Sequence, residues 1–197
     1  MKRTYNKTHN KDEIVQAGLD IIITKGFNGT GIESILKQAN VPKGSFYNFF
    51  SSKEEFGLAV IGLFLSEMGA LIQPVMENGS LPPLMRIRKS LEVLITRFED
   101  NNCNKGCLVG NLALEMSDQC EVFRQRLEEA LQRWIGSLAA ILEEAREEGF
   151  LTIDVEPVVL AENIVASFEG ALLRAKVKKS VEPLNNFIHL YFDKFLA

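Results

Sequence analysis

Apolar residues recur at spacings of three and four along most of the chain, which is the period of a helix with one buried face. No segment keeps the strict apolar–polar alternation of a half-buried strand. Glycine, proline and short polar runs separate the periodic segments. The pattern therefore predicts an all-α protein of about nine helices. The expected helices cover residues 10–24, 31–38, 42–50, 52–76, 82–98, 106–116, 121–149, 157–175 and 181–195.

The stretch 30–53 predicts two short helices joined by a tight turn. Thr30 opens a T-x-x-E sequence, the capping box that begins many helices. Pro42 suits the first turn of the next helix, where its missing N–H is not needed. Phe46 and Phe50 lie four residues apart and would bury one side of that helix, leaving the polar side open. This is the helix-turn-helix arrangement that places side chains in the major groove of DNA.

Ser52 begins another capping sequence, and the helix after it continues to near Met76. That helix is too long to belong only to a small three-helix module. We expect a helix-turn-helix domain over residues 1–53 and a larger helical domain over 54–197. The long helix would then be the only element joining the two, and would carry any mechanical signal between them.

Composition is that of an ordinary globular protein, with 46% hydrophobic and 24% charged residues. No run of about 18 apolar residues is present, which predicts no membrane span. The polar segment 1–13 lacks the apolar core of a secretory signal. Three cysteines do not form an even disulfide framework. Together these features favour a cytoplasmic protein.

The net charge of −4 is unevenly distributed. Residues 1–53 contain eight basic and four acidic side chains, whereas the rest of the chain contains fourteen basic and twenty-two acidic ones. A basic head on an acidic body suits a protein that touches phosphates at one end only. A solvated N-terminal helix would show a similar excess, so charge supports the DNA-binding interpretation without deciding it.

The sequence lacks the constellations of an enzyme. Its two histidines, His9 and His189, stand at opposite ends, and no nucleophile elbow, phosphate loop or zinc-protease motif is present. Cys103 and Cys107 are four apart but have no further ligands at zinc spacing. We expect no catalytic activity, no metal and no cofactor.

The segment VPKGSFYNFFSSKEEF, residues 41–56, resembles the recognition helix of TetR/AcrR-family transcriptional regulators. Asn48 stands where the family often has His, and Phe49 where it often has Tyr. The resemblance implies a homodimer that binds a palindromic operator in double-stranded DNA, most often as a repressor. It implies base or backbone contacts by Lys43, Gly44, Ser45 and Tyr47, phosphate contacts by Tyr47, Asn48 and Lys53, and help from Thr30 at the head of the second helix.

The resemblance also implies a small-molecule effector inside the helical body and a dimer interface built from the last two long helices. Small residues such as Ala166 and Gly170 would permit close helix contact there. The alternative is an architectural DNA-binding protein without an effector response. Each candidate lining residue also has an interpretation as core packing: Phe64, Met68, Phe98, Asn111, Glu115, Trp134 and Phe168. Asn111 and Glu115 are polar residues in an apolar helix, so we expect each to need a buried partner.

The segment GCLVGNLALE, residues 106–115, resembles a branch of this family that includes regulators responsive to electrophiles and oxidants. The resemblance implies that Cys107 is a sensor thiol. The segment AKVKKSVEPL, residues 175–184, resembles the same branch and implies that Lys176 lies near that thiol. A helix start and the nearby Lys105 would favour the thiolate. Cys103 would act as a resolving partner. The other interpretation is an inert thiol in the core, since cysteine is often fully buried.

Overall fold

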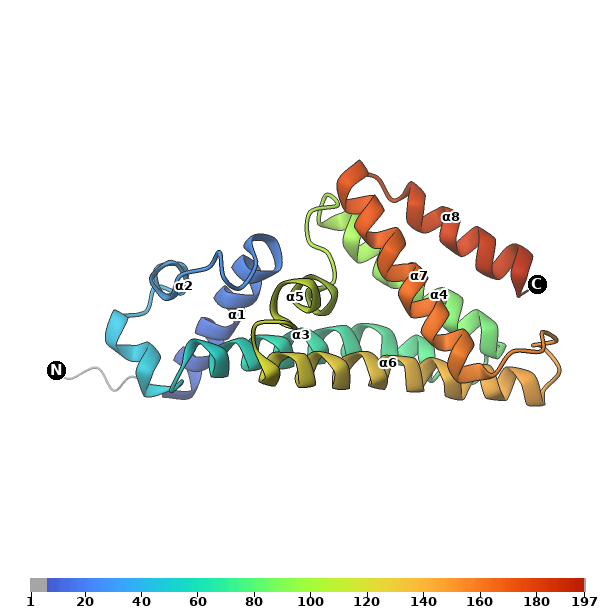
Figure 1. Ribbon diagram of the computed structural model, residues 1–197, viewed down its shortest axis with the longest axis horizontal. Helices are drawn as coiled ribbons and strands as arrows, with labels where there is room; N and C mark the ends of the chain where they lie inside the picture. Colours follow the sequence, from blue (N-terminus) through green and yellow to red (C-terminus); the bar gives the residue numbers. More distant parts are fainter. Residues whose placement is uncertain (1–6, 197) are drawn as a thin grey trace. The chain divides into compact units, whose positions relative to one another are not determined.

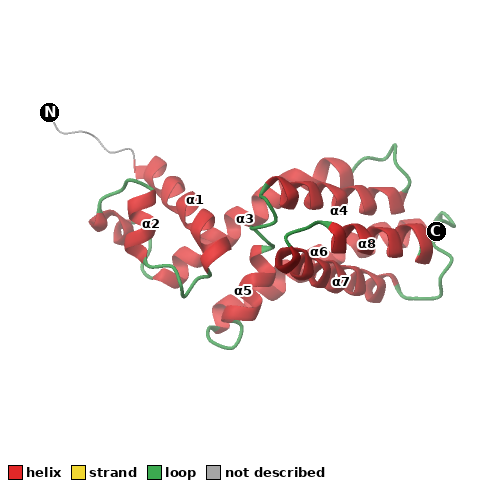
Figure 2. Ribbon diagram, turned by 90° about the horizontal axis from the view of Figure 1, so that it is seen from above, coloured by secondary structure: helices red, strands yellow, loops and turns green. Residues whose placement is uncertain are grey.

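The computed structural model describes the backbone of residues 7–196 and the side chains of that range, except those of residues 7–10, Lys43 and Ser45. The described residues form helices and no strands (Figure 1, Figure 2), which confirms the all-α prediction. The predicted third helix is a short 3-10 helix, η1, and the last one ends in a π-helical turn, η2. The elements are α1 (Lys7–Lys25), α2 (Ile32–Gln38), η1 (Lys43–Asn48), α3 (Lys53–Met76), α4 (Pro83–Asp100), α5 (Leu108–Met116), α6 (Glu121–Glu147), α7 (Pro157–Lys178), α8 (Glu182–Leu190) and η2 (Tyr191–Phe195).

The chain forms two compact units. The first comprises Met1–Glu67 and Leu108–Leu127, and the second comprises Met68–Cys107 and Glu128–Ala197. The chain therefore passes between the units within α3, immediately before α5 and within α6. The expectation that the long helix alone joins the two halves was wrong, because α5 returns to the first unit. The functional division at residue 53 stays a prediction.

Aromatic packing fixes the first unit. Phe46, Phe50 and Phe56 are buried, and their ring centroids lie 5.2–5.4 Å apart. Phe56 also lies against α1 at Gly18, where an added Cβ would come within 2.2 Å of the Phe56 ring. A glycine is needed there for close approach. The cluster joins η1 and the start of α3 to α1.

The start of α2 is capped differently from the sequence prediction. The N-cap of α2 is Gly31, and no side chain caps it. The Thr30 hydroxyl instead donates to the Gly26 carbonyl, 2.6 Å away, just beyond the end of α1. The capping box predicted at Thr30 is thus wrong, because a carbonyl left unpaired at the preceding helix end takes the hydroxyl. The cap at Ser52 is confirmed, since its Oγ accepts the N–H of Glu55 at 3.0 Å.

The beginning of the chain also differs from the prediction. Helix α1 starts at Lys7, three residues before the expected start at residue 10. Residues 1–6 lie outside the described part of the chain.

The second unit has a continuous apolar core. Helices α7 and α8 lie side by side, with α4 next to them (Figure 1, Figure 2). Each contributes fully buried residues to one cluster, among them Ile87 of α4, Ile164 of α7 and Leu184 of α8. The helical periodicity of the sequence is therefore explained by burial of one face of each helix.

Helix α3 departs from the expected absence of membrane-like segments. It is long and apolar enough to cross a bilayer by length and composition, with a mean hydropathy of 1.7 over its most apolar window. One such helix is weak evidence for a membrane span, and 17% of that window is buried. Phe56, Val60 and Ile61 of α3 are buried in the first unit.

Candidate nucleic-acid interface and effector site

The short helix η1 presents one polar side to solvent. Its back is fixed by Phe46, which is completely buried. Tyr47 is 67% exposed, its ring packed edge-on against Phe46 with centroids 5.3 Å apart. Gly44 and Asn48 are also exposed. The predicted contact positions Lys43 and Ser45 belong to η1, and their side chains lie outside the described ones.

Thr30 occupies a different environment from the one expected. Its side chain is 1% exposed and its hydroxyl is bound to the Gly26 carbonyl. A DNA contact by Thr30 stays a prediction, and this burial argues against it.

Lys53, the first residue of α3, is half-buried in the first unit. Its Nζ donates to the Phe27 carbonyl at 2.7 Å and lies 4.3 Å from the centroid of the Phe27 ring. Burial lowers the pKa of Lys53, and the nearby Glu115 opposes that shift. The ammonium group has further N–H donors available, so a phosphate contact stays a prediction. Its contacts with the Phe27 carbonyl and ring also join the start of α3 to the turn after α1.

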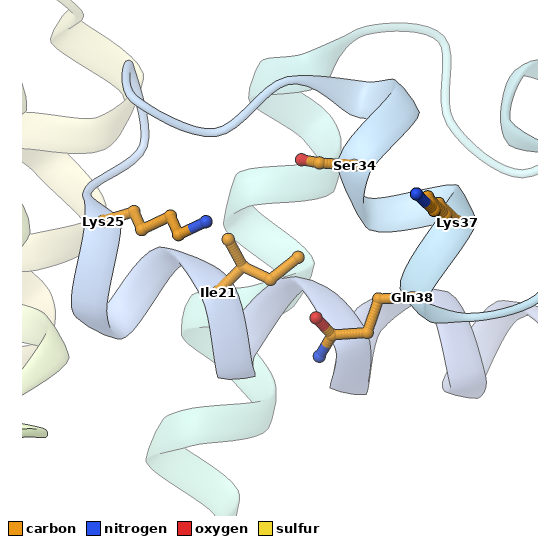
Figure 3. Close-up of a pocket in the computed structure, with 5 residues that line it drawn as sticks. All are labelled: Ile21, Lys25, Ser34, Lys37 and Gln38. Atoms are coloured by element: carbon orange, nitrogen blue, oxygen red, sulfur yellow. The ribbon is translucent and has the colours of Figure 1, made fainter.

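A shallow depression of about 410 Å³ lies between α1 and α2 (Figure 3). It is lined by Ile21 and Lys25 of α1 and by Ser34, Lys37 and Gln38 of α2. Sequence reasoning did not single out this surface. The positive balance of residues 1–53 was the signal that could have pointed to it.

Helix α5 binds the turn between α1 and α2 through its polar residues. The two oxygens of Glu115 accept the backbone N–H groups of Phe27 and Asn28 at 2.8 and 2.7 Å. Gly26 in this turn has a φ of +79°, and a Cβ there would lie 2.7 Å from a Glu115 oxygen. Asn111 donates its side-chain N–H to the Ile23 carbonyl at 3.2 Å.

These contacts change the interpretation of α5. Asn111 and Glu115 were expected to need buried partners, and both have them. The partners are backbone groups of the N-terminal module. An effector-lining role for either residue stays a prediction that these contacts oppose.

The remaining candidate lining residues divide between the units. Phe64 is buried in the first unit, whereas Met68 is half-buried in the second. Trp134 packs edge-to-face against Phe168, with ring centroids 6.0 Å apart. Phe98 belongs to the same core cluster as Phe168. Packing therefore accounts for these aromatic side chains, and contact with an effector stays a prediction.

The half-buried Cys107 lies beside a carboxyl group. Its thiol and the Glu169 side chain are joined by a hydrogen bond. The other Glu169 oxygen, Oε1, is completely buried and has no hydrogen-bond partner in the described part of the chain. Burial raises the pKa of Glu169 above its usual 4.5, while the bond with Cys107 acts in the opposite direction.

Sequence reasoning missed Glu169, although a signal was present. Glu169 follows Val165 by four residues and precedes Leu172 by three, so it lies near the buried side of α7. An acidic residue in that register is exceptional and marks a candidate site.

Cys103 and Lys176 are the other residues expected near Cys107. Cys103 is a buried free thiol, and Lys179 Nζ donates to its carbonyl at 3.3 Å and to Asn104 Oδ1 at 2.6 Å. Lys176 is half-buried on α7. Its proximity to the thiol and the resolving role of Cys103 stay predictions.

Helix α7 also has an exposed apolar stripe, defined here as Val159, Ala166, Gly170, Leu173 and Val177. Its members are spaced by seven, four, three and four residues, which keeps them on one side of the helix. Val177 is 80% exposed. The stripe contains the small residues predicted for a helix–helix contact.

Two protein-family models match the chain. The model described as bacterial regulatory proteins of the tetR family matches residues 14–60, which include α2 and η1. The model of the tetracyclin repressor-like C-terminal domain matches residues 83–191, more than half of the chain.

Individual relatives agree with this assignment. The chain is 33% identical to the HTH-type transcriptional repressor DhaR of Mycobacterium sp. (strain GP1) over 96% of its own length and 94% of that protein's. It is 37% identical to the transcriptional regulator AcuR of Cereibacter sphaeroides, covering 93% and 84% of the two chains. The crystal structure of the reduced form of Escherichia coli NemR matches with a TM-score of 0.81 and 32% identity, over 94% and 97% of the two chains.

DhaR and AcuR are at least as similar to this chain as NemR is, so the matches do not single out one branch of the family. They agree on the helix-turn-helix module and on the helical domain that follows it. This chain belongs to the TetR family of bacterial DNA-binding transcriptional regulators, which are not enzymes.

Proposed function

We propose that this protein represses transcription as a homodimer on a palindromic operator, and that an electrophilic or oxidising effector releases it by modifying Cys107. The observation that carries DNA binding is the exposed side of η1, anchored by the buried Phe46. Tyr47 reaches the sugar–phosphate backbone or a base edge from this side, with Lys43, Gly44, Ser45 and Asn48 beside it. An intracellular location follows from this function.

The apolar stripe of α7 supports the homodimer. Exposed Leu173 and Val177 would lose contact with water in an interface, while Gly170 and Ala166 would let two helices approach closely. A two-fold dimer also places two recognition helices about one turn of DNA apart, as a palindrome requires.

The position of Cys107 supports an effector-linked role. The thiol directly precedes α5, whose far end carries Glu115 on the turn between α1 and α2. A covalent change at Cys107 would thus act on the start of a nine-residue helix that ends on the DNA-binding module. We propose α5 as the route of coupling, in place of α3 alone. A rival function, an architectural DNA-binding protein, has no use for such a connection.

Tyr47→Ala tests DNA binding. We expect about a tenfold or larger loss of operator affinity with little change in thermal stability, because the side chain is exposed. Fluorescence anisotropy with operator DNA measures the affinity. Phe150→Ala, which removes a half-exposed aromatic side chain of the second unit, is the matched control. Equal affinities of the parent and Tyr47→Ala would contradict the assignment of η1.

Leu173→Glu tests the dimer. A charge on the apolar stripe should convert the dimer to a monomer, since an unpaired charge is costly to bury. Analytical ultracentrifugation of both proteins gives their masses. Leu114→Glu introduces the same charge at a residue of α5 that is 84% exposed, and should leave the mass unchanged. A Leu173→Glu protein that remains dimeric would exclude this stripe as the interface.

Cys107→Ser tests the sensor. The parent should release operator DNA when treated with acrolein, benzoquinone or hypochlorite, and the variant should not, because serine is a far weaker nucleophile. Cys120→Ser, at another half-buried free thiol, should respond like the parent. Equal release from Cys107→Ser and the parent would refute the sensor. Absence of release from both proteins would favour a non-covalent ligand or an architectural function.

Glu115→Gln tests the coupling route. The amide keeps the shape of the side chain but gives up one acceptor oxygen, so the two N–H groups of the turn can no longer both be paired by this side chain as they are now. We expect normal alkylation of Cys107 with at least several-fold weaker release of DNA. Asp118→Asn, at an exposed carboxylate just after α5, is the control. Unchanged release from Glu115→Gln would place the route elsewhere.

A further inference from the structure

In the second unit, the carboxyl group of Glu169 contacts the thiol of Cys107, and the proposed function gives Glu169 no role. Glu169 lies on α7 and Cys107 directly before α5, and a hydrogen bond joins the thiol to the carboxyl group. Glu169 is half-buried as a whole, but its Oε1 is completely enclosed and has no partner in the described part of the chain. Cys107 itself packs against the apolar core of this unit.

The surroundings of Glu169 disfavour its negative charge more than a surface site would. Burial raises the pKa of Glu169, and among the described residues only the Cys107 thiol acts against that shift. A basic side chain that paired with the carboxylate would lower the pKa further, and none contributes to it. A carboxylate that loses hydration in this way is a better proton acceptor than one on the surface.

The same surroundings oppose a free thiolate. A thiolate and a carboxylate in hydrogen-bond contact would repel each other strongly in a poorly hydrated site. A negative sulfur is therefore favoured only when Glu169 has taken a proton. The pair therefore shares one proton, which is bound either to the Cys107 sulfur or to the Glu169 carboxyl group.

We propose that Glu169 is the proton relay of Cys107 and that the effector is an α,β-unsaturated carbonyl compound. This inference rests on the proposed sensor role of Cys107. The Glu169 carboxylate takes the thiol proton as the sulfur bonds to the β-carbon, and the electron pair of the C=C bond moves to the α-carbon and carbonyl oxygen. The protonated Glu169 then returns the proton to the α-carbon. The product is a neutral thioether, so atoms and charge balance without another reactant.

The relay distinguishes this class of effector from oxidants. Addition to an unsaturated carbonyl requires a base at the thiol and then an acid at the α-carbon, which one carboxyl group supplies in turn. Oxidation by hypochlorite or peroxide uses the thiolate but needs no proton returned to carbon. The Cys107–Glu169 pair disfavours a free thiolate and keeps the thiol proton on the Glu169 carboxyl group during the reaction. Such a site therefore suits unsaturated carbonyl compounds better than oxidants.

Glu169→Gln provides the test. The amide keeps the size of the side chain and its hydrogen-bonding capacity but cannot accept the thiol proton. Acrolein is the probe, and intact-protein mass spectrometry follows the formation of one adduct per chain over time. The rate is measured from about pH 6 to about pH 9, because a free thiol has a pKa of about 8.5 and is mostly protonated over the lower part of this range. The same rates are measured in Cys107→Ser to subtract reaction at the other cysteines. Glu162→Gln, an exposed carboxylate on the same helix, is the matched control.

At pH 7 we expect alkylation of Cys107 to slow on the order of 100-fold in Glu169→Gln and to be unchanged in Glu162→Gln. The rate in the parent should vary little with pH, because the proton moves within the pair. The rate in Glu169→Gln should rise about tenfold per pH unit, as free thiolate forms. A role limited to packing would lower stability without producing this change in pH profile. Glu169→Asp, which retains a carboxyl group, should restore part of the flat profile.

The outcomes separate the two proposals. If the parent is alkylated at Cys107 and releases DNA, but Glu169→Gln reacts at the same rate with the same pH profile, the relay is refuted and the sensor stands. If acrolein leaves Cys107 of the parent unmodified, the sensor assignment fails first. If Glu169→Gln does not fold, a pH profile in the parent that rises tenfold per unit would by itself overturn the relay, and a flat one supports it.

Discussion

The carboxylate of Glu115 fixes the turn on which the DNA-binding module is built. It accepts two consecutive backbone N–H groups, those of Phe27 and Asn28, from a helix more than 80 residues further along the chain. The Phe27 carbonyl is bound in turn by Lys53 at the start of α3. Both the N–H and the carbonyl of Phe27 are therefore hydrogen-bonded to side chains, which fixes the backbone from which α2 and η1 continue. Charge-assisted bonds of this kind are stronger than neutral ones.

Through this contact α5 takes part in both DNA binding and effector sensing, the two activities of the proposed function. The helix begins directly after Cys107 and ends at the residue following Glu115. Its buried residues Leu108 and Leu112 keep it packed as one rigid piece. In the proposed function, modification of Cys107 at one end of this helix would displace the turn held at its other end, because packed helices move as bodies and do not deform gradually.

The second unit combines an apolar core with the carboxyl group of Glu169, one oxygen of which has no hydrogen-bond partner among the described residues. Most buried polar groups in proteins have partners, so the enclosed Oε1 of Glu169 calls for an explanation. Burial of this carboxyl group raises its pKa, and its hydrogen bond to the Cys107 thiol is the contact on which the proposed proton relay rests. Trp134 packs edge-to-face against Phe168, which is itself a member of this core.

The sequence by itself determined the helices and the buried positions of the N-terminal module, because periodicity and the four-residue spacing of Phe46 and Phe50 are local properties. It could not decide which partner Thr30, Glu115 or Glu169 would take. A threonine before a helix can cap it or bind the preceding turn, and the capping box alone does not distinguish these. Glu115 and Glu169 pair with groups distant in sequence, and only tertiary packing brings such groups within hydrogen-bond reach.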